Sequence, residues 1–328
     1  MHVTREILIR VAKETVQARA YSDPKLVAAY LSGSLRTDNP FLGRTTDIDI
    51  IFVHAKTPRI RREIVPLTPE IHLDLIHNPR SDYDKPKDLR IHPWLGPELY
   101  DPLPLLVNEH FFEFIQAGVR NKYNEPANIL ARARRNAVHA RQVWSGLQTS
   151  QETGTALMYS YLTSISHAAN AVALMMNGDP LAERRFLLQF PRYAEAAGKP
   201  ELAGMLLHLL GADDVDIEGL RACLSAWERD FVEAAGRPRV EARIAIPRLA
   251  YYKLACESML ASESPQTILW PLLLTWTLAA QALPATHQAT WYSTCKGMGL
   301  TGPGFREKAA CLDKYLDSIE ELLDNAPE

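Results

Sequence analysis

The sequence has few cysteines, no large excess of charge of either sign and no long uninterrupted apolar run. The formal net charge is −3 over 328 residues, which provides no basic field for binding nucleic acid. The cysteines all lie in the second half of the chain without the spacing of metal ligands, and we expect free thiols at Cys223, Cys256, Cys295 and Cys311. These absences argue against a disulfide framework, a zinc finger and a broadly basic nucleic-acid-binding protein.

No stretch of the sequence predicts a membrane span. The longest apolar run, residues 268–280, contains Pro271 and is shorter than the roughly 20 residues that cross a bilayer. We expect it to form a buried helix. Residues 1–6 are polar and lack the apolar core of a signal peptide. Together with the expected free thiols, this favours a cytoplasmic protein.

Two aspartates open an apolar strand in the first sixth of the chain. Residues 26–31 read as one strand and residues 47–53 as a second, which begins with Asp47 and Asp49. Because a strand has a period of two, both carboxylates project from the same face. Adjacent carboxylates repel each other unless a cation lies between them. Oxygen ligands of this kind suit Mg²⁺.

A third carboxylate and a glycine turn extend this pattern. Residues 70–77 alternate as a strand with Asp74 at its middle, so pairing beside the second strand would complete a cluster of three carboxylates for two metal ions. Gly33 and Ser34 follow the first strand. Glycine allows the backbone to approach a phosphate closely, and a serine hydroxyl adds one more donor. The pattern therefore predicts phosphoryl chemistry.

The order Gly33-Ser34, Asp47-Ile48-Asp49 and then Asp74 resembles the polymerase β-like nucleotidyltransferase superfamily. The resemblance covers roughly residues 1–120. The length and the helical remainder look most like the antibiotic nucleotidyltransferases of the kanamycin and lincosamide kind.

The resemblance implies transfer of a nucleoside monophosphate from an NTP, expected to be ATP, to a hydroxyl of a small molecule, with two Mg²⁺ ions. Asp47, Asp49 and Asp74 would be the catalytic and metal-binding residues. Nucleotide contacts are expected from Gly33, Ser34, Arg36 and Arg44.

Alternative interpretations of the same residues are simpler. The aspartates can belong to an acidic surface turn, or to a degenerate site that binds nucleotide without turnover. His72 shares a face with Asp74, which suggests zinc. We favour the harder oxygen site, with His72 at its rim.

The remainder of the chain has helical periodicity. Before it, we expect residues 55–62 to be a hairpin connection, Glu98-Leu99-Tyr100 to be a short strand and residues 105–119 to be a helix. Further helices are expected over residues 127–147, 152–177, 181–196, 199–211, 217–235, 243–262, 266–282 and 303–324.

The helix over residues 127–147 carries Arg132, Arg134, Arg135, His139 and Arg141. Three interpretations stay open: a solvated basic face, a cation for the triphosphate, and a ribonuclease site. Arg135-Asn136 followed by His139 resembles the Arg-Asn…His motif of HEPN-type ribonucleases, one residue shorter than usual.

Two further polar groups lie in the helical part. We expect His167 and Asn170 to form a buried hydrogen-bonded pair. Asp213, Asp214, Asp216 and Glu218 either attract a cationic substrate or form an acidic surface loop.

The predicted fold class is α+β, with a small mixed-sheet nucleotidyltransferase domain over residues 1–122 and an all-helical domain over residues 123–328. The predicted partners are an NTP and a small hydroxyl acceptor, without a membrane or nucleic acid, and the pattern leaves the oligomeric state open. The alternative function is a nucleotide-binding regulator or toxin–antitoxin-type module with a HEPN-like helical domain.

Overall fold

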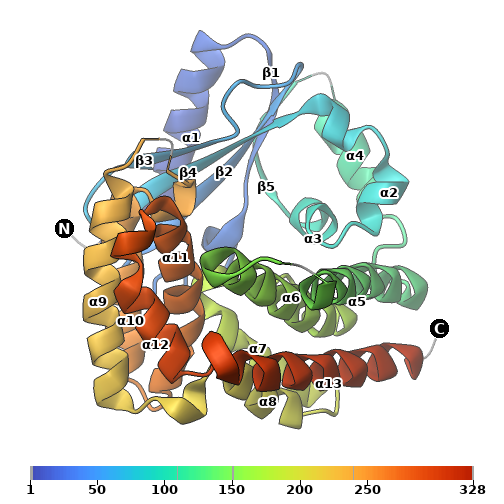
Figure 1. The fold of residues 1–328 in the computed structure, drawn as a ribbon. Helices are drawn as coiled ribbons and strands as arrows, with labels where there is room; N and C mark the ends of the chain where they lie inside the picture. Colours follow the sequence, from blue (N-terminus) through green and yellow to red (C-terminus); the bar gives the residue numbers. More distant parts are fainter. Residues whose placement is uncertain (1–2, 109, 150, 239, 327–328) are drawn as a thin grey trace. The chain divides into compact units, whose positions relative to one another are not determined.

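The computed structural model describes residues 3–108, 110–149, 151–238 and 240–326, which belong to two compact units, Met1–Glu125 and Pro126–Glu328. The first unit contains a mixed sheet and the second is helical (Figure 1), so the predicted α+β class is confirmed. The division lies close to the expected boundary at residues 122–123.

The sheet of the first unit has the order β3-β4-β2-β1-β5. β2 and β4 are parallel, whereas the other neighbouring strands are antiparallel. The strands are β1 (Leu26–Leu31), β2 (Thr46–His54), β3 (Arg62–Pro66), β4 (Ile71–Pro79) and β5 (Leu103–Val107).

The expected hairpin between the two acidic strands is wrong. Because β2 and β4 are parallel, the chain must cross over between them. It does so through β3, which forms an antiparallel pair with β4 at the edge of the sheet. β3 is short and only half-buried, so its alternation is too weak to read from sequence.

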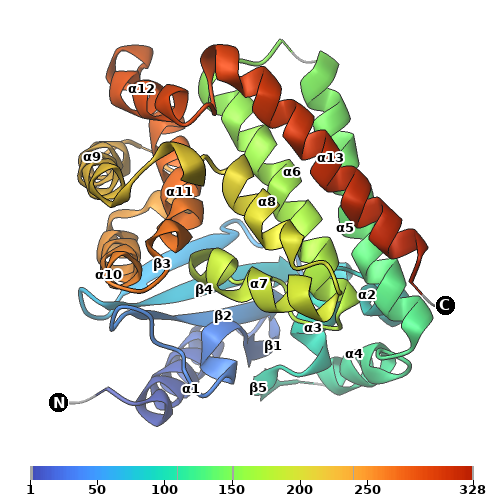
Figure 2. The same cartoon turned by 90° about the horizontal axis from the view of Figure 1, so that it is seen from below.

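Helices of the first unit pack on both faces of this sheet, and Figure 2 shows α1 below the strands. Helix α1 (Arg5–Ser22) packs Leu8, Ala12 and Val16 against one face. The other face is covered by α2 (Pro86–Arg90), α3 (Leu95–Tyr100) and α4 (Phe111–Arg120). Thr4 caps α1, because its hydroxyl accepts from the Ile7 amide.

Two expectations near the end of the first unit are wrong. Glu98-Leu99-Tyr100, expected as a strand, ends helix α3, and the first residues of the expected helix 105–119 belong to β5. Ala28 pairs with Val107, and the Asn108 side chain donates to the Leu26 carbonyl at 3.0 Å. These long-range contacts with β1 hold the segment as a strand.

The second unit consists of helices joined by short turns. α5 and α6 pack against each other, and the buried α11 includes all but the first residue of the apolar run 268–280, as expected. α12 was not predicted. The helices are α5 (Pro126–Thr149), α6 (Gly154–Met175), α7 (Phe186–Ala196), α8 (Glu201–Leu209), α9 (Ile217–Ala235), α10 (Leu249–Leu260), α11 (Leu269–Ala282), α12 (Ala289–Gly297) and α13 (Phe305–Asp324).

Within the described part of the chain, no helix combines the length and the apolar character that a bilayer crossing requires.

Candidate functional site

The parallel pairing of β2 and β4 brings the predicted acidic residues together. Asp47 lies opposite His72, and Asp49 lies opposite Asp74. Paired residues in a parallel sheet point to the same face, so all four side chains leave the sheet on one side. The alternate residues, which include Ile48 and Ile50, are buried on the α1 face. Burial of that apolar set fixes the register and therefore the position of the acids.

Three of these side chains form a group that can hold a metal ion. Asp47, His72 and Asp74 each offer one ligand atom, and these atoms lie within 4.8 Å of one another. The residues are 6%, 1% and 0% exposed, respectively. Carboxylate oxygens and an imidazole nitrogen are donor atoms that bind divalent cations, so the chemistry of this group fits such an ion.

Asp49 lies beside this group and is held against Gly33. Gly33 has a φ of +68°, and an added Cβ would lie 1.8 Å from Asp49 Oδ2. The Ser32 amide also donates to the Asp49 carbonyl at 3.0 Å. Glycine at position 33 therefore serves two purposes: it adopts the left-handed backbone and leaves space for the carboxylate.

The other predicted nucleotide contacts lie on the same loop. Gly33–Arg36 is a single 3₁₀ turn, and Ser34 Oγ lies 3.3 Å from Thr46 Oγ1 at the start of β2. Arg44 is exposed, with a φ of +63°, in the tight turn between Leu42 and Thr45. The structure thus places Ser34 beside the acidic strand and Arg44 at the tip of the next turn.

Sequence reasoning missed the arginine that pairs with Asp74. Arg62, the first residue of β3, donates from Nε to Asp74 Oδ1 at 2.8 Å and from Nη2 to Oδ2 at 2.6 Å. This bidentate pair orients the carboxylate and supplies a positive charge beside it. The basic run before Arg62 was the available signal, but only the β3–β4 pairing assigns Arg62 to this carboxylate.

A second missed group lies behind the glycine loop. The Tyr30 hydroxyl donates to Glu98, and it lies 3.0 Å from the Tyr83 hydroxyl. Burial raises the pKa of Glu98, while the Tyr30 hydrogen bond and the nearby Arg36 oppose the rise. The charge of Arg36, on the loop that carries Gly33, therefore acts on this carboxylate of α3.

A chain of titratable side chains lies at the far end of the acidic strands. His54 Nε2 lies 2.8 Å from His77 Nδ1, and Glu63 Oε1 lies 3.0 Å from His77 Nε2. Glu63 also pairs with Arg19 on α1, and Asp23 lies 3.4 Å from His54. Burial lowers the pKa of both histidines. This chain connects the end of α1 with three strands.

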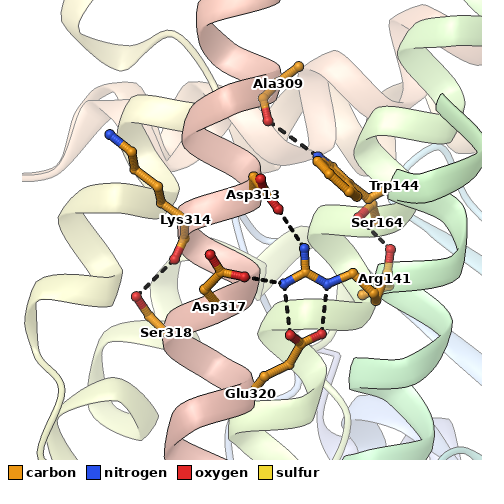
Figure 3. Close-up of polar contacts among 10 residues, drawn as sticks. Arg141, Trp144, Ser164, Ala309, Asp313, Lys314, Asp317, Ser318 and Glu320 are labelled. Atoms are coloured by element: carbon orange, nitrogen blue, oxygen red, sulfur yellow. Dashed lines mark hydrogen bonds and ion pairs between the residues drawn. The ribbon is translucent and has the colours of Figure 1, made fainter. Parts of the chain in front are cut away.

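In the helical unit, Arg141 on α5 binds carboxylates of α13 (Figure 3). Its guanidinium binds Asp313 at 2.5 Å, Asp317 at 2.6 Å and both oxygens of Glu320 at 2.8 Å. These hydrogen bonds raise the pKa of Arg141. They tie α5 to α13, so a phosphate ligand would have to displace three carboxylates to use this arginine.

The residues that resemble the ribonuclease motif lie next to a second histidine. The ring centroids of His139 and His167 are 4.1 Å apart, and His167 Nδ1 lies 3.1 Å from Asn136 Oδ1. His167 and Asn170 do not pair with each other as expected. The Asn170 side chain instead accepts from the Leu181 amide and donates to the Ser166 carbonyl, both at 2.8 Å.

The acidic residues near the start of α9 make local contacts. Asp216 caps the helix by accepting from the Gly219 amide at 2.8 Å. Asp213 lies 2.6 Å from His208, and Asp214 lies 3.3 Å from Lys308. Glu218 pairs with Arg221 on the same helix. These local contacts account for the cluster as a helix cap, a contact with a histidine and two ion pairs with basic residues.

No family model matches the chain, and no curated protein matches it.

Proposed function

We propose that this chain is a metal-dependent nucleotidyltransferase that transfers a nucleoside monophosphate from an NTP to a hydroxyl group. The observation that supports the proposal best is the register of β2 and β4. It puts Asp47, Asp49 and Asp74 on one face of the sheet, and Asp49 touches the Gly33 turn. The resemblance to the polymerase β-like superfamily predicts this combination, and no match to a known family supports it independently.

The proposed reaction is a displacement at the α-phosphorus of the NTP. The acceptor oxygen forms a bond to that phosphorus, the bond to the bridging oxygen of the β-phosphate breaks, and pyrophosphate leaves while the hydroxyl proton passes to a base. Gly33 and Ser34 would contact the phosphates. Both oxygens of Asp74 already accept from Arg62, so Asp74 suits an electrostatic role better than that of the proton acceptor.

Asp47 and Asp74 would hold a divalent ion, with Asp49 beside them. Such an ion supplies charge for the transferring phosphoryl group and lowers the pKa of a bound hydroxyl. The oxygen donors fit an ion of this class, because one oxygen of Asp47 and one oxygen of Asp74 lie within 4.8 Å of each other on the same face of the sheet.

The test is transfer of radiolabelled AMP from ATP to a panel of aminoglycosides, lincosamides, protein and tRNA. We expect label on a small hydroxyl-bearing acceptor, with pyrophosphate release that requires the acceptor. Asp47→Asn should abolish transfer, whereas Asp88→Asn on α2 should not. Absence of transfer to every acceptor class, with intact ATP recovered, would count against the proposal.

A second candidate function is RNA cleavage by the helical unit. The packing of His139 on His167, whose Nδ1 also lies 3.1 Å from Asn136 Oδ1, is the observation that favours it. RNA cleavage that is lost in His139→Ala and kept in Asp47→Asn would support this function. Intact RNA after incubation with the wild-type chain would reject it.

A further inference from the structure

We infer that His72 is a metal ligand and that the site binds a first-row transition-metal dication in preference to Mg²⁺. The inference rests on the proposed function only in placing a divalent ion at this group. It departs from the oxygen-only site that the resemblance implies, in which His72 lies at the rim. The difference concerns which ion the protein selects.

The backbone fixes the position of His72 relative to the carboxylates. His72 lies directly opposite Asp47 in the parallel pair, and two residues before Asp74 on the same strand. A ring nitrogen of His72 and one oxygen from each aspartate lie within 4.8 Å of one another. Ligands of a small octahedral dication lie about 3 Å apart when adjacent and about 4.2 Å apart when opposite. Because three ligands cannot all be opposite one another, binding requires the ligand atoms to close by up to about 2 Å.

The chemistry of the donor set selects the ion. Mg²⁺ prefers oxygen ligands and retains waters, whereas imidazole nitrogen binds Mn²⁺ weakly and the later first-row dications more strongly. His72 is 1% exposed. An imidazole this deeply buried between two carboxylates competes with water for a place on the ion, and it favours a transition metal over Mg²⁺.

Arg62 supports this arrangement rather than opposing it. Its two hydrogen bonds use one acceptor position on each oxygen of Asp74. A carboxylate oxygen has two acceptor positions, so a bidentate hydrogen bond from arginine does not by itself exclude a metal ion. The guanidinium also makes a second dication beside Asp74 less favourable, since two like charges would face the same carboxylate.

The experiment is electron spin echo envelope modulation of the full-length chain loaded with Mn²⁺, without nucleotide. We expect ¹⁴N modulation from a directly bound nitrogen, and its replacement by ¹⁵N modulation when the chain is prepared with ¹⁵N-histidine. We also expect His72→Asn to lose the signal and to bind Mn²⁺ about tenfold more weakly. His110→Asn, a matched change at an exposed residue, should keep both.

Bound Mn²⁺ without nitrogen modulation in the wild-type chain would overturn the inference, and so would a signal that survives in His72→Asn. The wild-type isotope measurement does not depend on the folding of any variant. The inference and the proposed function can fail separately. Nitrogen ligation without nucleotidyl transfer would remove the function alone, and transfer with an all-oxygen ion would remove the inference alone.

Discussion

At the residue scale, Gly33 is the position where a single methyl group should have the largest effect. Its Cβ would overlap Asp49 Oδ2, and its φ of +68° is unfavourable for alanine. We predict that Gly33→Ala lowers the free energy of unfolding by about 1–3 kcal/mol and weakens metal binding, because Asp49 must move. Urea denaturation and Mn²⁺ titration measure the two effects.

Gly204 provides the matched control for this change. It lies in helix α8, and nothing lies within 4 Å of its added Cβ. Gly204→Ala should stabilise the chain by about 0.5–1 kcal/mol, since alanine has the higher helix propensity. If both variants were equally stable, Gly33 would not have the steric role assigned to it.

Arg62 is predicted to compensate the buried charge of Asp74. The Asp74 side chain is only 1% exposed, so Arg62→Met leaves a carboxylate without this partner in a buried place. We expect a loss of about 3 kcal/mol in unfolding free energy, part of which Mn²⁺ should restore by supplying a cation.

The neighbouring Arg61 serves as the control. Its side chain is 58% exposed and lies 3.8 Å from Asp82. Arg61→Met should change the stability by no more than about 0.5 kcal/mol. Equal effects of the two substitutions, or no effect of Mn²⁺ on Arg62→Met, would contradict the role of Arg62.

The sequence predicts some of these residues and not others for a physical reason. Strand alternation was sufficient to put Asp47 and Asp49 on one face, because that property is local. Asp74 is predicted as a partner on the assumption that its strand pairs beside the strand of Asp47 and Asp49, and the structure bears out this pairing. Arg62 was not predicted, since its position depends on the pairing of an edge strand.

At the scale of elements, Arg141 joins α5 to α13 through several ion pairs. Arg141 binds three carboxylates from α13, which would repel one another without it. We predict that Arg141→Met destabilises the chain by about 2 kcal/mol, measured by urea denaturation. Arg134→Met, which removes a 3.6 Å contact from a side chain 48% exposed, should cost less than about 0.5 kcal/mol. Similar losses in both variants would show that the cluster has no special role.

The packing of α5 on α6 should make stability depend on pH. Burial, and to a smaller extent the charge of His139, lowers the pKa of His167 to about 4, whereas an unfolded histidine titrates near about 6.5. The unfolded chain therefore takes up a proton first as the pH falls. The stability due to neutral His167 is complete above about pH 6.5 and is lost towards pH 4.

We predict that this histidine contributes about 1–2 kcal/mol to the loss of stability in acid, allowing for its partial exposure. His54 and His77 also have lowered pKa values and act in the same direction. Denaturation of wild type and His167→Gln at several pH values isolates the contribution of His167. The variant should show a shallower dependence, and an unchanged slope would refute the assignment.

The periodicity of apolar residues predicts the long helices correctly but does not predict the short elements. The bounds of α9 match the expected 217–235 because its apolar positions recur over five turns with an aspartate cap. β3, β5 and α12 are short, and neighbouring elements decide their conformation. The segment 103–107 is apolar enough for a helix or a strand, and pairing with β1 selects the strand.

At the scale of the whole molecule, the two units carry different kinds of group. The sheet unit contains the acidic cluster, the glycine turn and the arginine that pairs with Asp74. The helical unit contains the ion pairs of Arg141 with α13 and the ring contact between His139 and His167. The proposed chemistry therefore depends on the sheet unit, and the proposed acceptor specificity has no residue assigned to it.

The most direct test of the account is calorimetric titration of ATP into the full-length chain with and without Mn²⁺, for wild type and for Asp49→Ala. The account predicts that nucleotide binding requires the metal and that Asp49→Ala weakens it by at least about tenfold, or 1.4 kcal/mol. Equal nucleotide affinity in the two proteins, with the metal present, would contradict the claim that these carboxylates form a metal–nucleotide site.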